Sequence, residues 1–523
     1  MNHKVLITTS GLGSRLGELT KYTNKALVRI GKKPAISYVI ETYPLNTNFV
    51  ITLGYKGNQV KDFLELAYPD RKFAFVWVDK YEGPGASLGY SMLQARDKLQ
   101  EPFIYHACDT IVERFSIPDI KNNWAAGLLV NNFDHYTSFT SFDGEISSFN
   151  KKKVGKIGDH AHVGLVGIYN YREYWDILDQ LYCEDPNNSD LNDVSVLLEM
   201  LKNSMRVRSI SLDHWLDIGN SSSLANARLR ISDKFDNLDK VDESLFFFDK
   251  FVIKFFSDPE KIKKRVERGN ILGKLVPKTL EVKENFYKYG YVEGEKYSEV
   301  VTPQDLDQFM VWVKKNLWKS EKEVEASEFK KRCRDFYERK TKERVEMFLA
   351  KRNIKDVENV INGKKVPTLK DLFSQIDFEW LSDGLQTGFH GDFILENILK
   401  TKNGYTLLDW RQDFNGLLRA GDMYYDLAKF YHNLTVNHDT ISKNNFTINV
   451  SNENIICSIE RKTNLLESEK KFEEIIQKNK FDMKKVKILR AIIWLNMSPL
   501  HHQPFDIFLF YFGKYYLWKT LKE

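Results

Sequence analysis

Residues 388–397 read Gly-Phe-His-Gly-Asp-Phe-Ile-Leu-Glu-Asn, and this stretch decides what the second half of the chain can be. Within it, His390, Asp392 and Asn397 follow the spacing H-x-D-x-x-x-x-N. Phosphoryl transfer to an alcohol needs a carboxylate that accepts the proton of the attacking hydroxyl, and an amide five residues later can hold magnesium. The spacing therefore predicts a phosphotransferase loop, with Asp392 as the catalytic carboxylate and Asn397 as a metal ligand.

A second magnesium ligand is predicted twelve residues further along the chain. The pair Asn403-Gly404 lies between two apolar runs, and this arrangement is a strong signal for a β-hairpin. Folding of the hairpin brings Asp409 back beside Asn397. We therefore expect Asn397 and Asp409 to converge on one metal ion.

Length and composition limit the class of protein. A chain of 523 residues exceeds what one hydrophobic core usually serves, so two domains are expected. The formal charge of +5 is small, and the lysines are interleaved with acidic residues, so no nucleic-acid partner is predicted. The four cysteines lie far apart, which favours a reducing, cytoplasmic location over disulfides or a zinc site. No apolar run approaches the ~20 residues of a membrane span, and the aromatic stretch 505–518 is expected to be a buried helix.

Apolar strands alternate with helical segments in the first half. Strands are predicted at residues 4–9, 49–53, 73–78, 103–107 and 126–131. This alternation is typical of an α/β fold with a mostly parallel, doubly wound sheet. The polar segment 233–243 then interrupts the apolar periodicity. We predict one domain at residues 1–232, a linker at 233–243 and a second domain at 244–523.

A glycine-rich turn follows the first predicted strand. Backbone N–H groups in such a turn can bind phosphate oxygens, and here the turn is Gly11-Leu12-Gly13-Ser14, with Arg15 and Lys25 adding positive charge. Asp109 follows the strand at 103–108, at the strand end where α/β folds place ligands, and Asp217 lies in the stretch 215–220. Two such carboxylates can hold Mg2+ against a nucleoside triphosphate.

The order and spacing of these motifs resemble the nucleotidyltransferases that act on sugar phosphates and phosphocholine. The matching motifs are Gly11-Leu12-Gly13-Ser14-Arg15-Leu16, Asn24-Lys25-Ala26-Leu27, Gly83-Pro84-Gly85-Ala86-Ser87-Leu88-Gly89, Asp109, His162-Val163-Gly164 and Trp215-Leu216-Asp217-Ile218-Gly219-Asn220. The resemblance implies a Rossmann-like fold for residues 1–232. It also implies that the glycine-rich turn, Arg15 and Lys25 bind the triphosphate.

The same resemblance implies roles for further residues. Gly85 and Ser87 would flank the nucleotide base, and Asp109 and Asp217 would hold magnesium. The Lys-Ala-Leu triplet at 25–27 and the short domain are more similar to phosphocholine cytidylyltransferases than to larger sugar-nucleotide enzymes, which favours CTP over another nucleoside triphosphate. Thr9-Ser10 and Asn24 depart from the usual residues of these motifs without removing a charge.

From about residue 240 onward the chain resembles the choline kinase and aminoglycoside phosphotransferase family, which has a bilobal, protein-kinase-like α+β fold. The residues that carry the resemblance are Val252-Ile253-Lys254-Phe255, the loop 389–397, Leu407-Leu408-Asp409-Trp410 and Gly421-Asp422-Met423-Tyr424-Tyr425-Asp426-Leu427-Ala428. The resemblance implies that Lys254 contacts ATP phosphates, with Glu267 as its partner, and that Asp426 braces the catalytic loop.

The second half also departs from that family in two places. No glycine-rich phosphate loop precedes Lys254, and residues 246–250 occupy the place of that turn. Arg411 stands where an acidic residue often follows the metal-binding aspartate. Both departures affect how ATP would bind and which class of alcohol would be the acceptor. The three residues predicted for catalysis and metal binding, Asp392, Asn397 and Asp409, are all present.

The two predicted chemistries are consecutive. The second half would phosphorylate a small alcohol with ATP, and the first half would join that phosphate to a nucleotide and release pyrophosphate. This pairing suggests a bifunctional enzyme that activates a small alcohol, with CTP as the expected nucleotide, for decoration of a surface polysaccharide or lipid.

Three alternatives to this reading stay open. The alcohol can be choline, a sugar or a polyol, and the aromatic residues Trp410, Trp494, Tyr511, Tyr515 and Tyr516 can form a cage for a cation or simply pack in the core. The second half can instead be an inactive regulatory module. A glycosyltransferase would use the same sheet and metal site but would leave Arg15 and Lys25 without a role.

Overall fold

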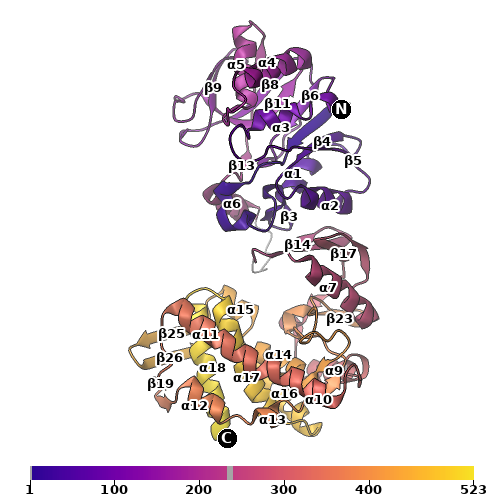
Figure 1. Ribbon diagram of the computed structural model, residues 1–523, viewed down its shortest axis with the longest axis vertical. Helices are drawn as coiled ribbons and strands as arrows, with labels where there is room; N and C mark the ends of the chain where they lie inside the picture. The colour runs from indigo at the N-terminus through magenta and orange to yellow at the C-terminus, as the bar shows by residue number, and fades with distance from the viewer. Residues whose placement is uncertain (1–2, 232–239) are drawn as a thin grey trace. The chain divides into compact units, whose positions relative to one another are not determined.

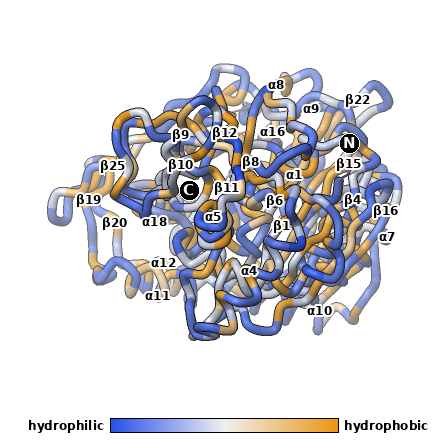
Figure 2. Tube along the Cα trace, turned by 90° about the horizontal axis from the view of Figure 1, so that it is seen from above, coloured by the Kyte–Doolittle hydropathy of each residue, from blue (hydrophilic) through white to orange (hydrophobic). Residues whose placement is uncertain are grey.

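The computed structural model describes residues 3–231 and 240–523 (Figure 1). The chain divides into two compact units: Met1–Pro259 with Glu281–Lys288, and Glu260–Leu280 with Tyr289–Glu523. The predicted linker at 233–243 lies mostly outside the described residues, so the predicted domain boundaries stay predictions. Apolar and polar stretches alternate along the whole trace instead of gathering in one part of it (Figure 2).

A nine-stranded sheet forms the centre of the first unit, in the order β5-β4-β1-β6-β11-β8-β12-β10-β9. Its strands are β1 (Lys4–Thr8), β4 (Asn48–Leu53), β5 (Lys72–Trp77), β6 (Phe103–His106), β8 (Asn123–Leu129), β9 (Ser138–Phe142), β10 (Glu145–Asn150), β11 (His160–Ile168) and β12 (Val207–Ser211). The strands predicted from the sequence at 4–9, 49–53, 73–78, 103–107 and 126–131 correspond to β1, β4, β5, β6 and β8.

The sheet is mixed, where the sequence predicted a mostly parallel one. Strand β1 pairs in parallel with β4 and β6, and β4 pairs in parallel with β5. Strand β11, however, runs antiparallel to both β6 and β8. The antiparallel pair β9–β10 is joined by Asp143 and Gly144, whose φ angles are +50° and +74°. Positive φ at both central residues is the signature of a tight hairpin, a local signal that the strand pattern alone does not carry.

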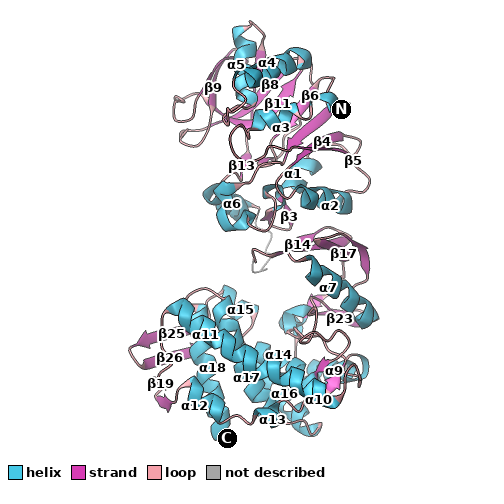
Figure 3. Cartoon of the chain, in the orientation of Figure 1, coloured by secondary structure: helices cyan, strands magenta, loops and turns pink. Residues whose placement is uncertain are grey.

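Helices cover both faces of this sheet, as a doubly wound fold requires (Figure 3). The helices of the first unit are α1 (Ala35–Glu41), α2 (Gly57–Ala67), α3 (Leu88–Leu93), α4 (Tyr171–Glu184), α5 (Asp193–Lys202) and α6 (Ser221–Arg230). In β1, Val5 and Ile7 belong to the core that includes α1 and α2, whereas Leu6 belongs to the core that includes α3, α4 and α5. Since successive side chains of a strand point to opposite faces, one apolar strand supplies both cores.

Short helices and strands lie in the connections between the main elements of the first unit. They are η1 (Ser14–Thr20), η2 (Lys25–Leu27), β2 (Arg29–Ile30), β3 (Lys33–Pro34), η3 (Arg96–Lys98), β7 (Thr110–Val112) and β13 (Trp215–Asp217). Strands β7 and β13 pair antiparallel, with Asp217 opposite Thr110. This pairing brings two distant segments of the chain together immediately after Asp109.

A hairpin that follows the predicted linker belongs to the first unit. Strands β14 (Glu243–Phe247) and β15 (Phe251–Phe256) pair antiparallel, and Phe246, like Phe286, lies against Phe63 of α2. The ring centroids of Phe63 and Phe246 are 5.2 Å apart, and Phe63 is fully buried. We call Phe63, Phe246 and Phe286 the aromatic seam.

Most helices of the described chain lie in the second unit. They are α7 (Pro259–Leu272), α8 (Tyr297–Val300), α9 (Pro303–Asn316), α10 (Ala326–Arg334), η5 (Asp335–Arg339), α11 (Lys340–Arg352), α12 (Leu369–Ser374), α13 (Phe378–Leu381), α14 (Met423–Thr435), α15 (His438–Ser442), α16 (Thr463–Lys478), α17 (Met483–Met497) and α18 (Phe505–Lys522). Trp494 of α17 contacts His432 of α14 and Phe512 of α18, with ring centroids 6.3 and 4.8 Å away, so these three helices share a core.

The strands of the second half are short. They are β16 (Thr279–Val282), β17 (Phe286–Gly290), β18 (Glu295–Lys296), β19 (Asn359–Ile361), β20 (Lys364–Val366), β21 (Gln386–Thr387), β22 (Ile398–Thr401), β23 (Gly404–Leu407), β24 (Gly421–Asp422), β25 (Phe446–Ser451) and β26 (Asn454–Ile459). The aromatic stretch at 505–518 lies in α18, where most side chains are buried, as predicted. Among the described residues, no helix combines the length and the apolar character that crossing a membrane would require.

Candidate functional site

A cavity of about 630 Å³ in the first unit gathers most of the residues predicted to bind a nucleotide. Those among its lining residues are Gly11, Leu12, Gly13, Ser14, Arg15, Lys25, Ser87 and Asp109. They come from the turn after β1, from η2, from the start of α3 and from the end of β6. The cavity therefore lies at the carboxyl ends of parallel strands, where α/β sheets bind ligands.

The glycine-rich turn needs glycine at position 13 for two reasons. Gly13 has φ +67°, which side chains disfavour, and a Cβ there would lie 2.9 Å from Cβ of Lys25. Gly13 also caps the start of η1, so backbone N–H groups lie beside the cavity. The turn can therefore hold phosphate oxygens while Lys25 approaches closely.

Lys25 and Asp109 form an ion pair at the wall of this cavity. Burial opposes the charge on both groups, but each stabilises the other. The Asp109 carboxylate raises the pKa of Lys25, and the Lys25 ammonium lowers the pKa of Asp109. Both side chains are therefore charged at neutral pH, which suits an ammonium that binds phosphate and a carboxylate that binds a cation.

Asp109 and Asp217 face a common point, as predicted for two magnesium ligands. A Cβ built on Gly219 would lie 2.9 Å from Oδ1 of Asp217 and 3.4 Å from Oδ2 of Asp109. The Gly219 N–H donates to Asp217, and the Tyr136 hydroxyl lies 3.3 Å from the other carboxylate oxygen. In the part of the chain that the structure describes, no group of three His, Cys, Asp or Glu side chains could hold a metal. Magnesium commonly takes one or two carboxylates and completes its shell with phosphates and water, and the metal role of Asp109 and Asp217 stays a prediction.

The loop at residues 83–87 contributes one of its two predicted residues to the cavity. Ser87 lines the cavity and accepts a hydrogen bond from the Tyr90 N–H at the start of α3, at 3.0 Å. Gly85 is not among the lining residues; its N–H donates to the Asn187 carbonyl at 3.1 Å. Its φ of +78° and the closeness of Pro186 require glycine there, so Gly85 shapes the loop, and a direct contact with the base stays a prediction.

Several residues of this site were not predicted from the sequence. Tyr81, Glu82 and Ser189 line the cavity, and the Tyr136 hydroxyl donates to Asp217, which is itself not among the lining residues. Asn24, noted only as a departure from the family pattern, is fully buried, and its amide donates to the carbonyls of Thr9 and Tyr55 at 2.9 and 2.6 Å. Asn24 therefore fixes the segment that carries Lys25, a role visible only once the loops are folded.

In the second unit, the loop at 388–397 is held by a buried carboxylate. The N–H groups of His390 and Gly391 both donate to Asp426 at 2.7 Å, and the Trp318 indole N–H donates to it at 3.2 Å. The predicted bracing role of Asp426 is confirmed. Burial raises the pKa of Asp426 to about 6.

Asp392, the predicted catalytic carboxylate, is paired with a lysine that the sequence analysis missed. Nζ of Lys429, on α14, lies 2.7 Å from the Asp392 carboxylate. Burial opposes ionisation, yet Lys429 holds the pKa of Asp392 far below its usual range, and Asp392 raises the pKa of Lys429. Asn397 donates to the Asp392 carbonyl at 2.9 Å, so one turn positions both predicted residues.

The hairpin returns Asp409 to Asn397 as predicted, with a turn one residue earlier than expected. Thr401 pairs with Gly404, and the Leu408 N–H donates to the Asn397 carbonyl at 2.7 Å. The carboxylate of Asp409 accepts a hydrogen bond from Arg265 of α7 at 2.8 Å. The convergence of Asn397 and Asp409 suits a magnesium ligand pair, and their metal role stays a prediction.

Lys254, predicted to contact ATP phosphates, and Glu267, its predicted partner, are carried by different units. Lys254 is buried on β15 in the first unit, with its Nζ 5.0 Å from the Phe256 ring centroid. Glu267 is exposed on α7 in the second unit, and its side chain makes no hydrogen bond or ion pair with any described residue. The predicted roles of both residues stay predictions.

The carboxy-terminal aromatic residues enclose a cation of the protein itself. The Arg490 guanidinium lies 5.1 Å from the Trp494 ring centroid and 5.2 Å from that of Tyr516. Trp410 is buried elsewhere and donates to the Arg265 carbonyl at 2.8 Å. These contacts agree better with aromatic residues that pack in the core than with a cage for a substrate cation.

Comparisons with known proteins relate part of the chain to cytidylyltransferases. The choline-phosphate cytidylyltransferase of Streptococcus pneumoniae is 33% identical over 106 residues, which are 20% of this chain and 44% of that protein. The glucose-1-phosphate cytidylyltransferase of Salmonella typhimurium is 37% identical over 62 residues, 12% of this chain and 24% of that protein. The matches thus span less than half the length of these relatives.

Among solved structures, a CTP:phosphocholine cytidylyltransferase from Streptococcus pneumoniae has a TM-score of 0.38 and 18% identity, and covers 44% of this chain and all of that one. An inositol-1-phosphate CTP transferase from T. maritima has a TM-score of 0.36 and 14% identity, and covers 44% of this chain and 97% of that one. No family model matches the chain. The sequence matches relate part of the chain to choline-phosphate and glucose-1-phosphate cytidylyltransferases, and the comparisons give no support for a kinase.

Proposed function

We propose that the first unit transfers a nucleotidyl group, with CTP as the expected donor, to the phosphate of a small phosphorylated alcohol. The observation that carries the proposal is the Lys25–Asp109 pair on the wall of a cavity that the glycine-rich turn also lines. The sequence likeness to two cytidylyltransferases supports it.

In the proposed reaction, a phosphate oxygen of the acceptor attacks the α-phosphorus of the nucleoside triphosphate, and pyrophosphate leaves. The turn at 11–14 holds phosphate oxygens through its N–H groups, and Arg15 and Lys25 offset the charge that develops there. Asp109 and Asp217 would hold magnesium, which neutralises phosphate charge when bound. Asn24 keeps Lys25 in place through its two hydrogen bonds to backbone carbonyls.

The test is pyrophosphate release by the full chain. CTP, UTP, GTP and ATP are each combined with phosphocholine, hexose 1-phosphates and polyol phosphates. Lys25→Met should reduce release by about 10²-fold or more, because the substitution removes a positive charge that offsets charge developing on the triphosphate. Lys21→Met is the matched control, since Lys21 is exposed and its Nζ lies 3.6 Å from the Glu18 carboxylate. Release that is equal in Lys25→Met and wild type would refute the assigned role of Lys25.

We propose that the second unit is a phosphotransferase that makes the phosphorylated alcohol. The supporting observation is the loop braced by Asp426, in which Asp392, Asn397 and Asp409 converge. Asp392 would accept the hydroxyl proton as the hydroxyl oxygen attacks the γ-phosphorus of ATP, and ADP would leave. Asn397 and Asp409 would hold magnesium.

ADP formation from ATP, measured against a panel of alcohols, tests this second proposal. Asp392→Asn should abolish ADP formation while pyrophosphate release by the first unit continues. If wild-type protein forms no ADP with any alcohol, the alternative of a regulatory module replaces the phosphotransferase. Pyrophosphate release with hexose 1-phosphates alone would favour the sugar alternative.

A further inference from the structure

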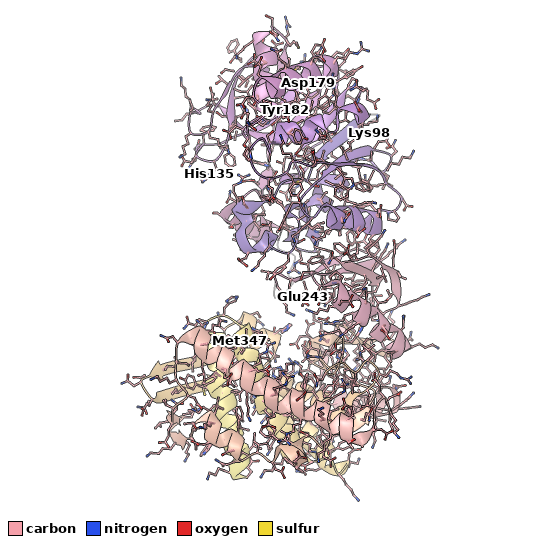
Figure 4. All side chains as sticks on the ribbon, viewed as in Figure 1. Lys98, His135, Asp179, Tyr182, Glu243 and Met347 are labelled. Atoms are coloured by element: carbon pink, nitrogen blue, oxygen red, sulfur yellow. The ribbon has the colours of Figure 1, made fainter. Side chains whose placement is uncertain are left out.

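A second cavity, of about 440 Å³, lies in the second unit and plays no part in the chemistry described so far. It is lined by residues of η5, α11 and one loop: Asp335, Phe336, Arg339, Lys340, Glu343, Arg344, Met347 and Asn415. Met347, labelled in Figure 4, lies on α11 at this wall. Three of its eight lining side chains are cationic and two are acidic.

The acidic side chains of this cavity are already engaged. Arg339 lies 2.7 Å from Glu343 and 3.7 Å from Asp335, so one guanidinium faces two carboxylates. Lys340 and Arg344 make no hydrogen bond or ion pair with a carboxylate anywhere in residues 3–231 or 240–523. Lys340 instead lies over the Phe336 ring, with Nζ 4.0 Å from its centroid. With three cationic and two acidic side chains, the cavity lining has a net charge of +1 when Lys340 is protonated.

Arg411 extends this charge to the catalytic loop. Its guanidinium lies 5.0 Å from the centroid of the same Phe336 ring, and its Nε donates to the Asp413 carbonyl at 3.0 Å. A Cβ built on Gly391 would lie 2.6 Å from Cβ of Arg411, so the Arg411 side chain packs directly against the residue before Asp392. Phe336 thus bridges the cavity and the loop that carries the predicted catalytic carboxylate.

The cations repel one another in the absence of an anion. Burial, together with the charges of Arg411, Arg344 and Lys429, lowers the pKa of Lys340 to about 7. Lys429 is neutralised by Asp392, and the nearby Asp413 by Lys264 at 3.0 Å. A bound anion would offset the repulsion among the three remaining cations and restore the full charge of Lys340.

We propose that Lys340, Arg344 and Arg411 bind an anionic group, a phosphate or a carboxylate, of the alcohol that the second unit phosphorylates. The inference rests on the proposed phosphotransferase and names its acceptor class: an alcohol with a negative charge beside its reacting hydroxyl. Arg411 does not line the cavity itself, but it packs against Gly391, the residue before Asp392, so an anion that reaches Arg411 lies beside the catalytic loop. A cationic acceptor such as choline would instead meet three like charges.

The group transfer itself balances without a further reactant. The acceptor oxygen forms a bond to the γ-phosphorus of ATP while the bond from that phosphorus to the oxygen of ADP breaks. The hydroxyl proton passes to Asp392. The anionic group of the acceptor takes no part in bond changes and serves to orient the hydroxyl.

The test uses the full chain and alcohols that share one three-carbon skeleton but differ in charge. Glycerate and glycerol phosphate are anionic, glycerol is neutral and serinol is cationic; choline is added as a second cation. ADP formation should favour the anionic alcohols. Lys340→Met and Arg344→Met should raise KM for them by roughly 10- to 100-fold, the worth of one charge-assisted hydrogen bond, with a smaller effect on kcat.

Lys342→Met is the matched control, because Lys342 lies on the same helix but is exposed and bonds Glu338. It should leave KM unchanged. A preference for serinol or choline, or equal KM values in Lys340→Met and wild type, would overturn the inference and leave the phosphotransferase intact.

A titration with inorganic sulfate, followed by calorimetry, separates failure of the inference from failure of the proposed function. Sulfate binding that Lys340→Met weakens at least tenfold, and Lys342→Met does not, supports the anion site even if no alcohol yields ADP. If no alcohol yields ADP and sulfate does not bind, both proposals fail. Sulfate should also compete with anionic alcohols and should not compete with ATP.

Discussion

Replacing Asp426 with asparagine should change the pH dependence of stability in a way that follows from its surroundings. The carboxylate is fully buried and accepts hydrogen bonds from the N–H groups of His390 and Gly391. Asparagine has one carbonyl oxygen, so one of these N–H groups would face an amide NH₂. Leaving that buried donor without an acceptor should cost about 1–3 kcal/mol at any pH.

The substitution also has a second effect on the free energy of unfolding, which favours the variant and depends on pH. Burial raises the pKa of Asp426 from 3.8 to about 6, so between these values the folded state holds a proton that the unfolded state has released. Wild-type stability therefore falls as pH rises through this window, by about 3 kcal/mol for a shift of roughly two pKa units. The asparagine variant lacks this loss. The variant should be clearly less stable than wild type near pH 4 and about equal to it, or more stable, above pH 7.

Urea unfolding of both proteins across this pH range, followed by tryptophan fluorescence, measures the difference. Asp439→Asn serves as a control, because a hydrogen bond from Lys462 lowers the pKa of Asp439, and its pH effect should have the opposite sign. If the free energies of unfolding of Asp426→Asn and wild type run parallel from about pH 4 to pH 7.5, the carboxyl is not perturbed by burial and the reasoning is wrong.

Three further outcomes are expected. Gly219→Ala places a Cβ 2.9 Å from the Asp217 carboxylate, so pyrophosphate release should need several-fold more magnesium, measured as the half-saturating concentration; an unchanged value contradicts the proposed metal site. Lys429→Met removes the charge that lowers the pKa of Asp392, so the acidic limb of ADP formation should move to higher pH in a pH–rate profile. Phe63→Ala empties the centre of the aromatic seam and should cost about 3–5 kcal/mol in urea unfolding; a loss under 1 kcal/mol would contradict its burial.

Much of the first candidate site could be predicted because its residues occur in short motifs. A glycine-rich turn after a strand, a lysine at a fixed distance and aspartates at strand ends each have a local chemical reason, and Lys25 and Asp109 do meet. Asn24 could not be predicted, because its hydrogen bonds join carbonyls of two distant segments. The direction of β11 was missed as well, since apolar alternation is the same in parallel and antiparallel strands.

In the second unit, the backbone geometry of the catalytic loop was predictable and its charge partners were not. The hairpin signal placed Asp409 beside Asn397 because a turn of two residues leaves little freedom. Lys429 and Arg265 lie on helices, and which helical side chain meets a carboxylate depends on how the helices pack. Glu267 illustrates the same limit. Its place on the helix after β15 suggested that it pairs with Lys254, but in the structure its side chain is exposed.

The aromatic seam changes how this protein can be dissected. The chain passes from one unit to the other at 259/260, at 280/281 and again at 288/289. Phe246 precedes the first of these boundaries and Phe286 follows the second, yet both rings pack against Phe63. A fragment that ends at residue 232 would lack Phe246 and Phe286, so the apolar face of α2 around Phe63 would be exposed to solvent and the fragment would tend to aggregate. Cleavage of one peptide bond would therefore not release the complete first unit. Producing that unit alone calls for attaching residues 281–288 to a fragment that ends at residue 259, or for polar substitutions on the apolar face of α2.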